Sequence, residues 1–180
     1  FPYTTLFRSP DDLNIGWCVS DTFIDRLNHD DPDAITRYQR SLKVKSVTGK
    51  GYFFFTDKVN NLNPQTYKDL GLKVKASNLC TEITLFSDKD HTFTCVLSSM
   101  NLEKWDEWKD TDAVYTSTVF LDCVASEFIS LAKDIPGMVA AVKFTSKSRA
   151  LGLGALGFHT LLQTKSIPFE SLEAHMLNIE

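Results

Sequence analysis

Apolar and polar positions alternate in a way that divides the chain into short strands and amphipathic helices. Continuous apolar runs predict buried strands at 13–19 (LNIGWCV) and 51–57 (GYFFFTD). Two helices are expected between these runs, the first capped by Ser20 or Asp21 and the second beginning at Asp33. The first half of the chain therefore predicts a strand, two helices and a second strand.

The second half of the chain contains both strand-like segments and a helical pattern. Lys73–Ser98 is rich in Thr, Val and Ile, which predicts two strand-like segments on either side of a turn at Ser87–Thr92. Asp112 is expected to cap the longest helix, whose inner face repeats every seven residues at Val114, Leu121 and Phe128. Strands and helices are mixed without the regular alternation of a doubly wound sheet, so we expect an α/β fold.

A glycine-rich segment, Gly152–Gly157, fits the pattern GxGxxG, and Glu173 follows about 20 residues later. A dinucleotide site needs a hydrophobic strand that leads directly into the first glycine. The preceding residues, Ser146–Arg149, are polar and favour a helix that begins at Ser146 or Ser148 and continues through Gln163. We therefore expect small residues that let this helix approach a neighbour closely, with dinucleotide binding as a weaker alternative.

Composition and charge narrow the class of partner. The chain has 180 residues, 43% of them hydrophobic, and a net charge of −4. That is enough for one domain with a sizeable core. The charge is spread without long basic blocks, and no apolar run approaches the roughly 18 residues of a membrane span. We expect no nucleic-acid partner, no membrane partner and a cytoplasmic location.

The N-terminal stretch FPYTTLFRS, residues 1–9, has neither an apolar face nor the layout of a signal peptide. Written back into codons, it can be read as the end of a common DNA-sequencing adapter. We interpret residues 1–9 as adapter translation rather than native sequence, and residues 10–180 as part of one domain. The gene is then expected to continue beyond the sequenced piece.

The four cysteines are far apart in the sequence and form no CxxC pair, which argues against a structural zinc site. Cys18 and Cys123 lie in apolar patterns and are expected to be buried and inert. His159 and His175 lie on predicted helices without an HExxH motif, so packing or surface roles are expected rather than metal ligation.

The residues with the clearest chemistry are in the segment NLCTE. In an extended strand, Asn78, Cys80 and Glu82 would point to the same side, which puts an amide, a thiol and a carboxylate in one row. A carboxylate beside the thiol disfavours a thiolate, so the row suits a protonated thiol or a sulfur radical. If Ser87–Thr92 is a turn, Cys95 returns close to Cys80. The alternative is an ordinary strand with a half-buried thiol.

These residues also carry a resemblance to a known family. SNLCTEITL followed by FTCVLSSMNL resembles the large, catalytic subunit of class I ribonucleotide reductase. The likeness extends to TGKGYFFFTDKVN, to the DAVY…FLDCVASEF helix and to RALGLGALGFHT, and it looks closest to versions from large tailed bacteriophages. The resemblance implies part of a ten-stranded α/β barrel with a catalytic finger loop, the barrel being incomplete here. It also implies that the glycine-rich segment is a helix that packs on the barrel.

The resemblance implies a role for each motif residue. Cys80 would become a transient thiyl radical, and Glu82 would be the general base on the 3′ hydroxyl of a ribonucleotide. Asn78 would hydrogen-bond the substrate, and Cys95 would be one member of the redox pair that supplies reducing equivalents. The partner cysteine of Cys95 lies upstream of the matched region in the family.

The family also implies cofactors and partners. The chain itself is expected to hold no cofactor or metal, since a metal-containing small subunit supplies the radical and dNTP and ATP effectors bind regions outside this chain. The other expected partners are a ribonucleotide, which class I members usually take as the diphosphate, a thioredoxin- or glutaredoxin-type reductant and a second copy of the large subunit. The chain alone is expected to be inactive. The alternative is a non-catalytic packing or binding remnant in which Cys80 and Cys95 are structural thiols.

Overall fold

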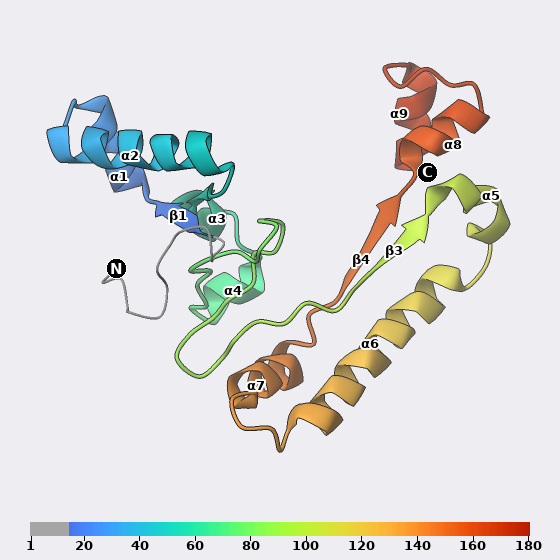
Figure 1. Cartoon of the computed structure of the whole chain (residues 1–180). Coiled ribbons are helices and arrows are strands. Elements are labelled where there is room, and N and C mark those ends of the chain that lie inside the picture. Colours follow the sequence, from blue (N-terminus) through green and yellow to red (C-terminus); the bar gives the residue numbers. More distant parts are fainter. Residues whose placement is uncertain (1–14) are drawn as a thin grey trace. The chain divides into compact units, whose positions relative to one another are not determined.

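The computed structural model describes residues 15–180. The adapter interpretation of residues 1–9 and the first two residues of the strand predicted at 13–19 lie outside the described residues. The chain divides into two compact units, one that extends to Asp90 and one that runs from His91 to Glu180 (Figure 1). Each unit is built around a pair of parallel strands.

The first unit begins with a β-α-β arrangement. Strand β1 (Gly16–Val19) leads into α1 (Asp21–Asn28) and α2 (Pro32–Thr48), and β2 (Tyr52–Phe55) returns parallel to β1. The apolar runs GWCV and YFFF explain why these strands form, because both faces of a parallel strand are usually covered. The predicted strands and the first predicted helix are confirmed.

Helix α2 begins earlier than the sequence pattern predicts. Its N-cap is Asp31, whose carboxylate accepts a hydrogen bond from the backbone N–H of Ala34 at 2.9 Å. Pro32 fits the first helical position because its missing N–H has no intrahelical partner to lose. The start expected at Asp33 is therefore wrong by one residue, and Asp33 instead pairs with Arg26 and Arg37.

Two short helices follow, α3 (Thr56–Asn61) and α4 (Gln65–Asp69), the second of which is the helical turn that Pro64 precedes. The strand-like segments predicted over Lys73–Ser98 are wrong up to Val96, since regular strand geometry begins only at β3 (Leu97–Asn101). Side chains supply the hydrogen bonds instead: Asn60 both donates to the carbonyl of Val74 and accepts from its N–H, at 2.8 and 3.0 Å. High strand propensity alone therefore did not produce paired β-strands in this segment.

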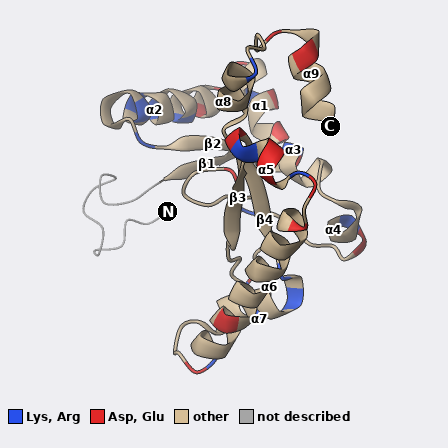
Figure 2. Ribbon diagram, turned by 90° about the vertical axis from the view of Figure 1, so that its right-hand side faces the viewer, with Lys and Arg blue, Asp and Glu red and all other residues tan. Residues whose placement is uncertain are grey.

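The second unit repeats the β-α-β arrangement. After β3 come the 3₁₀ turn η2 (Leu102–Lys104), α5 (Trp105–Trp108), α6 (Ala113–Ala132) and α7 (Val139–Ser148). Strand β4 (Gly152–Leu156) then pairs parallel with β3, and α8 (Phe158–Thr164) and α9 (Leu172–Ile179) complete the chain. The four strands carry no charged residue, and the charged residues lie on helices and loops (Figure 2).

The core of the second unit lies between α6 and the parallel strands. Val96, Leu121 and Ala125 are buried together, with Leu151 and Leu153 packed against them. The heptad prediction for α6 is confirmed at Leu121, whereas Val114 at the start of the helix is half exposed. Arg149 joins the end of α7 to α6, and its guanidinium lowers the pKa of the Asp122 carboxyl by a hydrogen bond of 2.6 Å.

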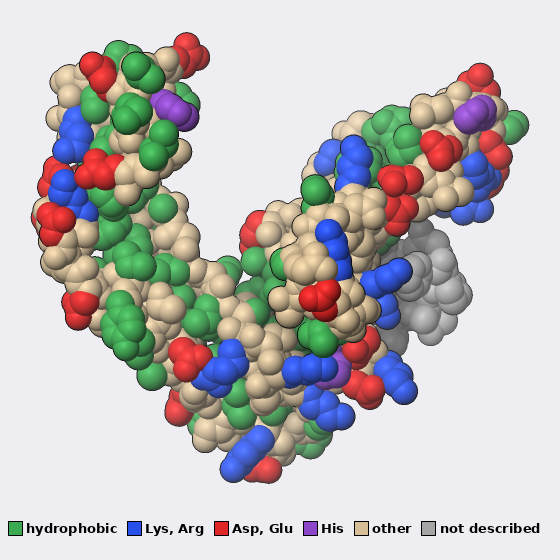
Figure 3. All heavy atoms as spheres, turned by 180° about the vertical axis from the view of Figure 1, so that it is seen from behind, with side chains coloured by type: hydrophobic (Ala, Val, Ile, Leu, Met, Phe, Trp, Pro, Cys, Tyr) green, Lys and Arg blue, Asp and Glu red, His purple; other side chains and the backbone are tan. Residues whose placement is uncertain are grey.

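Helix α6 is also long and apolar enough, by length and composition, to cross a membrane. This is weak evidence, because core helices of soluble proteins meet the same criterion. Hydrophobic side chains, including Tyr115, Phe120 and Leu131, are exposed on α6, and Figure 3 shows hydrophobic side chains at the surface of the second unit. Among residues 15–180 the two strand pairs do not close a barrel.

Candidate active site

The segment that carries the motif is a tight turn and not a strand. The N–H of Thr81 donates to the carbonyl of Asn78 at 3.2 Å, which closes the turn around Leu79 and Cys80. Thr81 has a φ of 68°, in the left-handed region that β-branched residues rarely adopt. The extended strand predicted over residues 78–82 is therefore wrong, and the chain reverses direction at the cysteine.

The Asn78 side chain holds the two ends of this turn together. Its Oδ1 accepts from the N–H groups of Glu82 and Ile83 at 3.2 and 3.1 Å, and its Nδ2 donates to Glu82 Oε1 at 2.7 Å. Ser77 adds a hydrogen bond from Oγ to the Ile83 carbonyl at 2.8 Å. Asn and Asp side chains commonly bond nearby backbone in this way, and turns form as a result.

The turn brings Asn78 and Glu82 together by a route different from the predicted one. The prediction relied on alternation along a strand, whereas the contact arises from the reversal of the backbone. Cys80 lies at the tip of the turn and is exposed, as is Glu82, while Asn78 is half-buried. The loop therefore presents an accessible thiol two residues from a carboxylate whose orientation is fixed by an amide.

Residues outside the motif connect the loop, and the chain just before it, to the parallel strands of the first unit. Tyr52 on β2 donates from its hydroxyl to the Asn78 carbonyl at 3.0 Å. Cys18 on β1 donates weakly from its thiol to the Lys75 carbonyl at 3.3 Å. Sequence reasoning did not select Tyr52, which lies in the apolar GYFFF run 26 residues before Asn78, or Asn60, which lies on α3.

Cys95 lies in the second unit, just before β3, and is exposed. The segment that carries it is attached to α7: the hydroxyls of Thr94 and Thr145 are 2.8 Å apart, and the Thr92 N–H donates to the Ala140 carbonyl at 3.1 Å. Cys80 and Cys95 belong to different units, so their proximity stays a prediction. Thr145 is almost fully buried and was not singled out from the sequence.

The structure also places the cysteines outside the motif, Cys18 and Cys123, and the two histidines considered from the sequence, His159 and His175. Cys18 and Cys123 are exposed, so the expectation that both are buried is wrong. His159 lies on α8 and His175 on α9, as predicted. Within residues 15–180 no three His, Cys, Asp or Glu side chains are grouped to hold a metal ion.

The glycine-rich segment is a strand and not a helix. Gly152 and Gly154 lie within β4, beside Leu97 and Ser99 of β3. A Cβ on Gly152 would lie 2.5 Å from Cδ2 of Leu97, so the missing side chain permits a close approach between strands. The sequence analysis was right to expect small residues at a close approach, but the element that approaches its neighbour is a strand and not a helix. The helix expected from Ser146 or Ser148 is instead the end of α7, because the chain leaves the helix at Arg149 with a φ of 43°.

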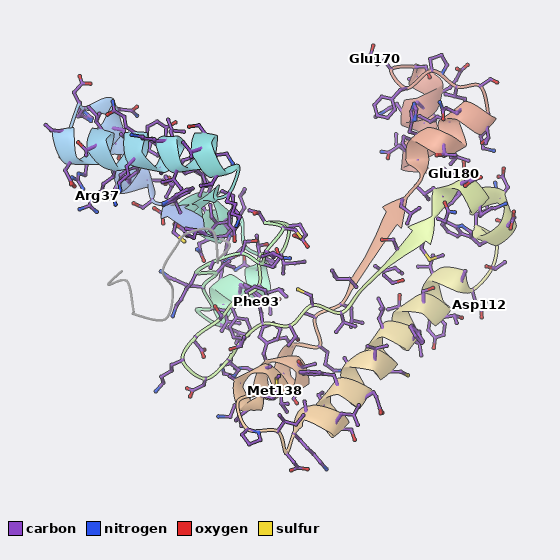
Figure 4. The ribbon with its side chains drawn as sticks, in the orientation of Figure 1. Arg37, Phe93, Asp112, Met138, Glu170 and Glu180 are labelled. Carbon is purple, nitrogen blue, oxygen red and sulfur yellow. The ribbon has the colours of Figure 1, made fainter. Side chains whose placement is uncertain are left out.

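One cavity of about 210 Å³ lies in the second unit and is mainly apolar. The last residue of the chain, labelled in Figure 4, borders it, and its carboxylate accepts from Lys109 Nζ at 3.5 Å. None of the four motif residues lines this cavity, whose walls are Leu102, Trp105, Phe158, Leu161, Leu177, Asn178 and Glu180. The cysteine-bearing turn, rather than this cavity, is the candidate site.

Two parallel β-α-β units define an α/β protein, the class that includes both doubly wound sheets and barrels. The family model described as "Ribonucleotide reductase, barrel domain" matches residues 32–180, and the chain belongs to this family. The family and the barrel-type α/β fold predicted from the sequence are therefore confirmed.

Individual relatives agree with the family. The chain is 38% identical over 142 residues to the ribonucleoside-diphosphate reductase large subunit of Invertebrate iridescent virus 3, covering 78% of this chain and 22% of the viral protein. It is 46% identical over 102 residues to the large subunit of Invertebrate iridescent virus 6, covering 56% and 10%. The matched part of the chain thus spans about a fifth or less of the length of these relatives. The closer resemblance to tailed-phage versions stays a prediction.

A solved structure is similar over nearly the whole chain. The class Id ribonucleotide reductase alpha subunit of Actinobacillus ureae superimposes with a TM-score of 0.80 at 45% identity, covering 92% of this chain and 32% of that protein. The fold of the described residues is thus that of a part of a reductase large subunit, with strands and helices of one barrel segment.

Proposed function

We propose that this chain is part of the catalytic barrel of a ribonucleoside-diphosphate reductase large subunit. The observation that carries the proposal is the turn at 78–82, in which an exposed Cys80 lies between Asn78 and the carboxylate that Asn78 holds. Membership of the reductase family supports it, as does the similarity to viral ribonucleoside-diphosphate reductase large subunits. The substrate class that we assign is a ribonucleoside diphosphate.

Each motif residue has a proposed step. A thiyl radical at Cys80 takes the 3′ hydrogen atom of the substrate and becomes a thiol, leaving a substrate radical. Glu82 accepts the proton of the 3′ hydroxyl, and Asn78 keeps Glu82 oriented while it hydrogen-bonds the substrate. An exposed thiol beside an oriented carboxylate supports this division of roles.

Cys95 is proposed to supply electrons. Together with a second cysteine outside the matched residues, it gives two electrons and two protons and forms a disulfide, while the 2′ hydroxyl leaves as water. A thioredoxin- or glutaredoxin-type protein then reduces the disulfide. The exposure of Cys95 supports such exchange, because thiol–disulfide exchange requires access to the sulfur.

The remaining partners belong to the whole protein. We propose a metal-containing small subunit as the source of the radical, dNTP and ATP effectors that bind outside this chain, a homodimer of large subunits and a cytoplasmic location. The 180-residue chain is proposed to be inactive alone, since it spans only 22% of a viral relative that it matches.

The test is a chimera in which residues 11–180 replace the matching part of a complete related large subunit. Ribonucleotide reduction is expected with the cognate small subunit, and Cys80→Ser should abolish it. Cys123→Ser, which changes an exposed thiol of α6 outside the motif, is the matched control and should retain activity. A folded chimera without activity, or an active Cys80→Ser variant, would favour the non-catalytic remnant.

A further inference from the structure

We propose that Tyr52 is a positioning residue for the loop that carries Cys80, an inference that rests on the proposed function. The Tyr52 hydroxyl donates to the carbonyl of Asn78 at 3.0 Å. The same carbonyl accepts the N–H of Thr81 at 3.2 Å, which is the hydrogen bond that closes the turn. Tyr52 therefore attaches the first residue of the turn directly to the parallel strands of the first unit.

The neighbouring strand makes room for this arrangement. Gly16 on β1 is paired in register with Tyr52 on β2. A Cβ on Gly16 would lie 2.5 Å from Cε2 of Tyr52 and 3.0 Å from Cζ, closer than such atoms approach. The tyrosine ring thus occupies the space that a side chain at Gly16 would need, and the glycine permits the ring position from which the hydroxyl reaches Asn78.

Other contacts hold the chain before the turn but stop short of it. Asn60 binds both backbone groups of Val74, and the Cys18 thiol donates to the Lys75 carbonyl. Tyr52 contacts the chain three residues further on, at the turn itself. Its hydroxyl is therefore placed to decide how firmly Asn78 is fixed, and with it the Glu82 carboxylate that Asn78 binds.

The loss of this hydroxyl is expected to loosen the turn without unfolding the unit. The ring of Tyr52 is half-buried and its packing remains in Tyr52→Phe. One neutral hydrogen bond contributes about 0.5–1.5 kcal/mol, which corresponds to about a 2- to 12-fold change in a rate or an equilibrium. We expect a loss of kcat within this range and little change in KM, because the chemistry needs the loop geometry more than the binding does.

Two experiments test the proposal. In the full 180-residue chain, hydrogen exchange at the Glu82 and Ile83 amides, which Asn78 Oδ1 holds, should accelerate in Tyr52→Phe, while the amides of β1 and β2 keep their rates. In the chimera, kcat of Tyr52→Phe should fall by about 2- to 12-fold.

Tyr38→Phe is the matched control, since the Tyr38 ring packs on Phe53 of the same unit at 5.8 Å and lies on α2. It should change neither readout.

Gly16→Ala gives a second variant that leaves the hydroxyl in place but displaces the ring. It should accelerate exchange at the same two amides, and the double variant Gly16→Ala/Tyr52→Phe should be no faster than the faster single one, because both act through one hydrogen bond. Unchanged exchange in both single variants would overturn the positioning role. So would an unchanged kcat in Tyr52→Phe when Cys80→Ser abolishes activity. An active Cys80→Ser chimera would instead refute the proposed function and leave the exchange result standing.

Discussion

The side-chain amide of Asn78 donates to the carboxylate of Glu82 at 2.7 Å, across the turn that carries Cys80. This hydrogen bond joins residues four positions apart that no regular helix or strand brings together here. The geometry of the proposed site therefore depends on one polar side chain and on the backbone groups that it binds.

Asn78→Ala is expected to destabilise the turn. It removes the acceptor for the N–H groups of Glu82 and Ile83, and an unsatisfied buried or half-buried donor costs about 1–3 kcal/mol. Exchange at those two amides should accelerate, and urea unfolding should show the loss. Asn78→Asp is the control, because it retains an acceptor oxygen for both amides but places a second carboxylate beside Glu82. Equal exchange rates in the alanine variant and the parent would contradict this account.

Secondary structure could be predicted from the sequence where a continuous apolar run is buried. It could not be predicted where side chains, rather than a paired strand, supply the hydrogen bonds of the backbone. GWCV and YFFF have few alternatives to a buried strand, and both were predicted. The turn at the motif was missed because Thr81 adopts a left-handed backbone, against the extended preference of threonine. Strand β4 was missed because glycine is uncommon in strands, and its reason for being there is the neighbouring Leu97.

Gly49 and Gly51 offer a matched pair for backbone strain. Both have positive φ, 68° and 90°, and both follow α2, which ends at Thr48. A Cβ at Gly49 meets nothing within 4 Å, so Gly49→Ala should cost about 1–2 kcal/mol from the backbone alone. A Cβ at Gly51 would overlap the ring of Trp17, which adds about 1–3 kcal/mol of overpacking. Urea unfolding of the two variants should rank them in that order, and equal losses would argue against the Trp17 contact.

The acid stability of the first unit should depend on Arg26. Arg26 lowers the pKa of Asp31 by a hydrogen bond of 2.8 Å, and Arg37 and Arg26 together lower the pKa of Asp33. Because both folded-state values are depressed, the pairs stabilise the fold above about pH 4 and lose this contribution as the pH falls below it.

Arg26→Gln should therefore reduce thermal stability at neutral pH and flatten its decline below about pH 4. Thermal melts from pH 7 to pH 2 measure both effects. Lys89→Gln, which changes an exposed pair with Asp90 at 4.0 Å, is the control and should leave the profile unchanged. A profile of Arg26→Gln that runs parallel to the parent would show that the two aspartates do not carry the acid dependence.

The environment of Cys95 should depend on a buried threonine. Thr145 is 1% exposed, and its hydroxyl is 2.8 Å from that of Thr94, the residue before Cys95. Thr145→Val keeps the shape of the side chain but removes this hydrogen bond, together with the one that the Thr145 hydroxyl donates to the Ala141 carbonyl at 2.8 Å, at a cost of about 1–2 kcal/mol. Local opening of the segment should then become about 5- to 30-fold more frequent. Hydrogen exchange at the Thr92 amide, which donates to the Ala140 carbonyl, should accelerate accordingly.

Mass spectrometry of the exchanged peptides measures this rate, with the amides of the first unit as an internal reference. Thr118→Val, which removes an exposed hydroxyl bond to the Val114 carbonyl on α6, is the matched control. If Thr145→Val exchanges the Thr92 amide at the parent rate, the Thr94–Thr145 contact does not hold the segment before Cys95 in place.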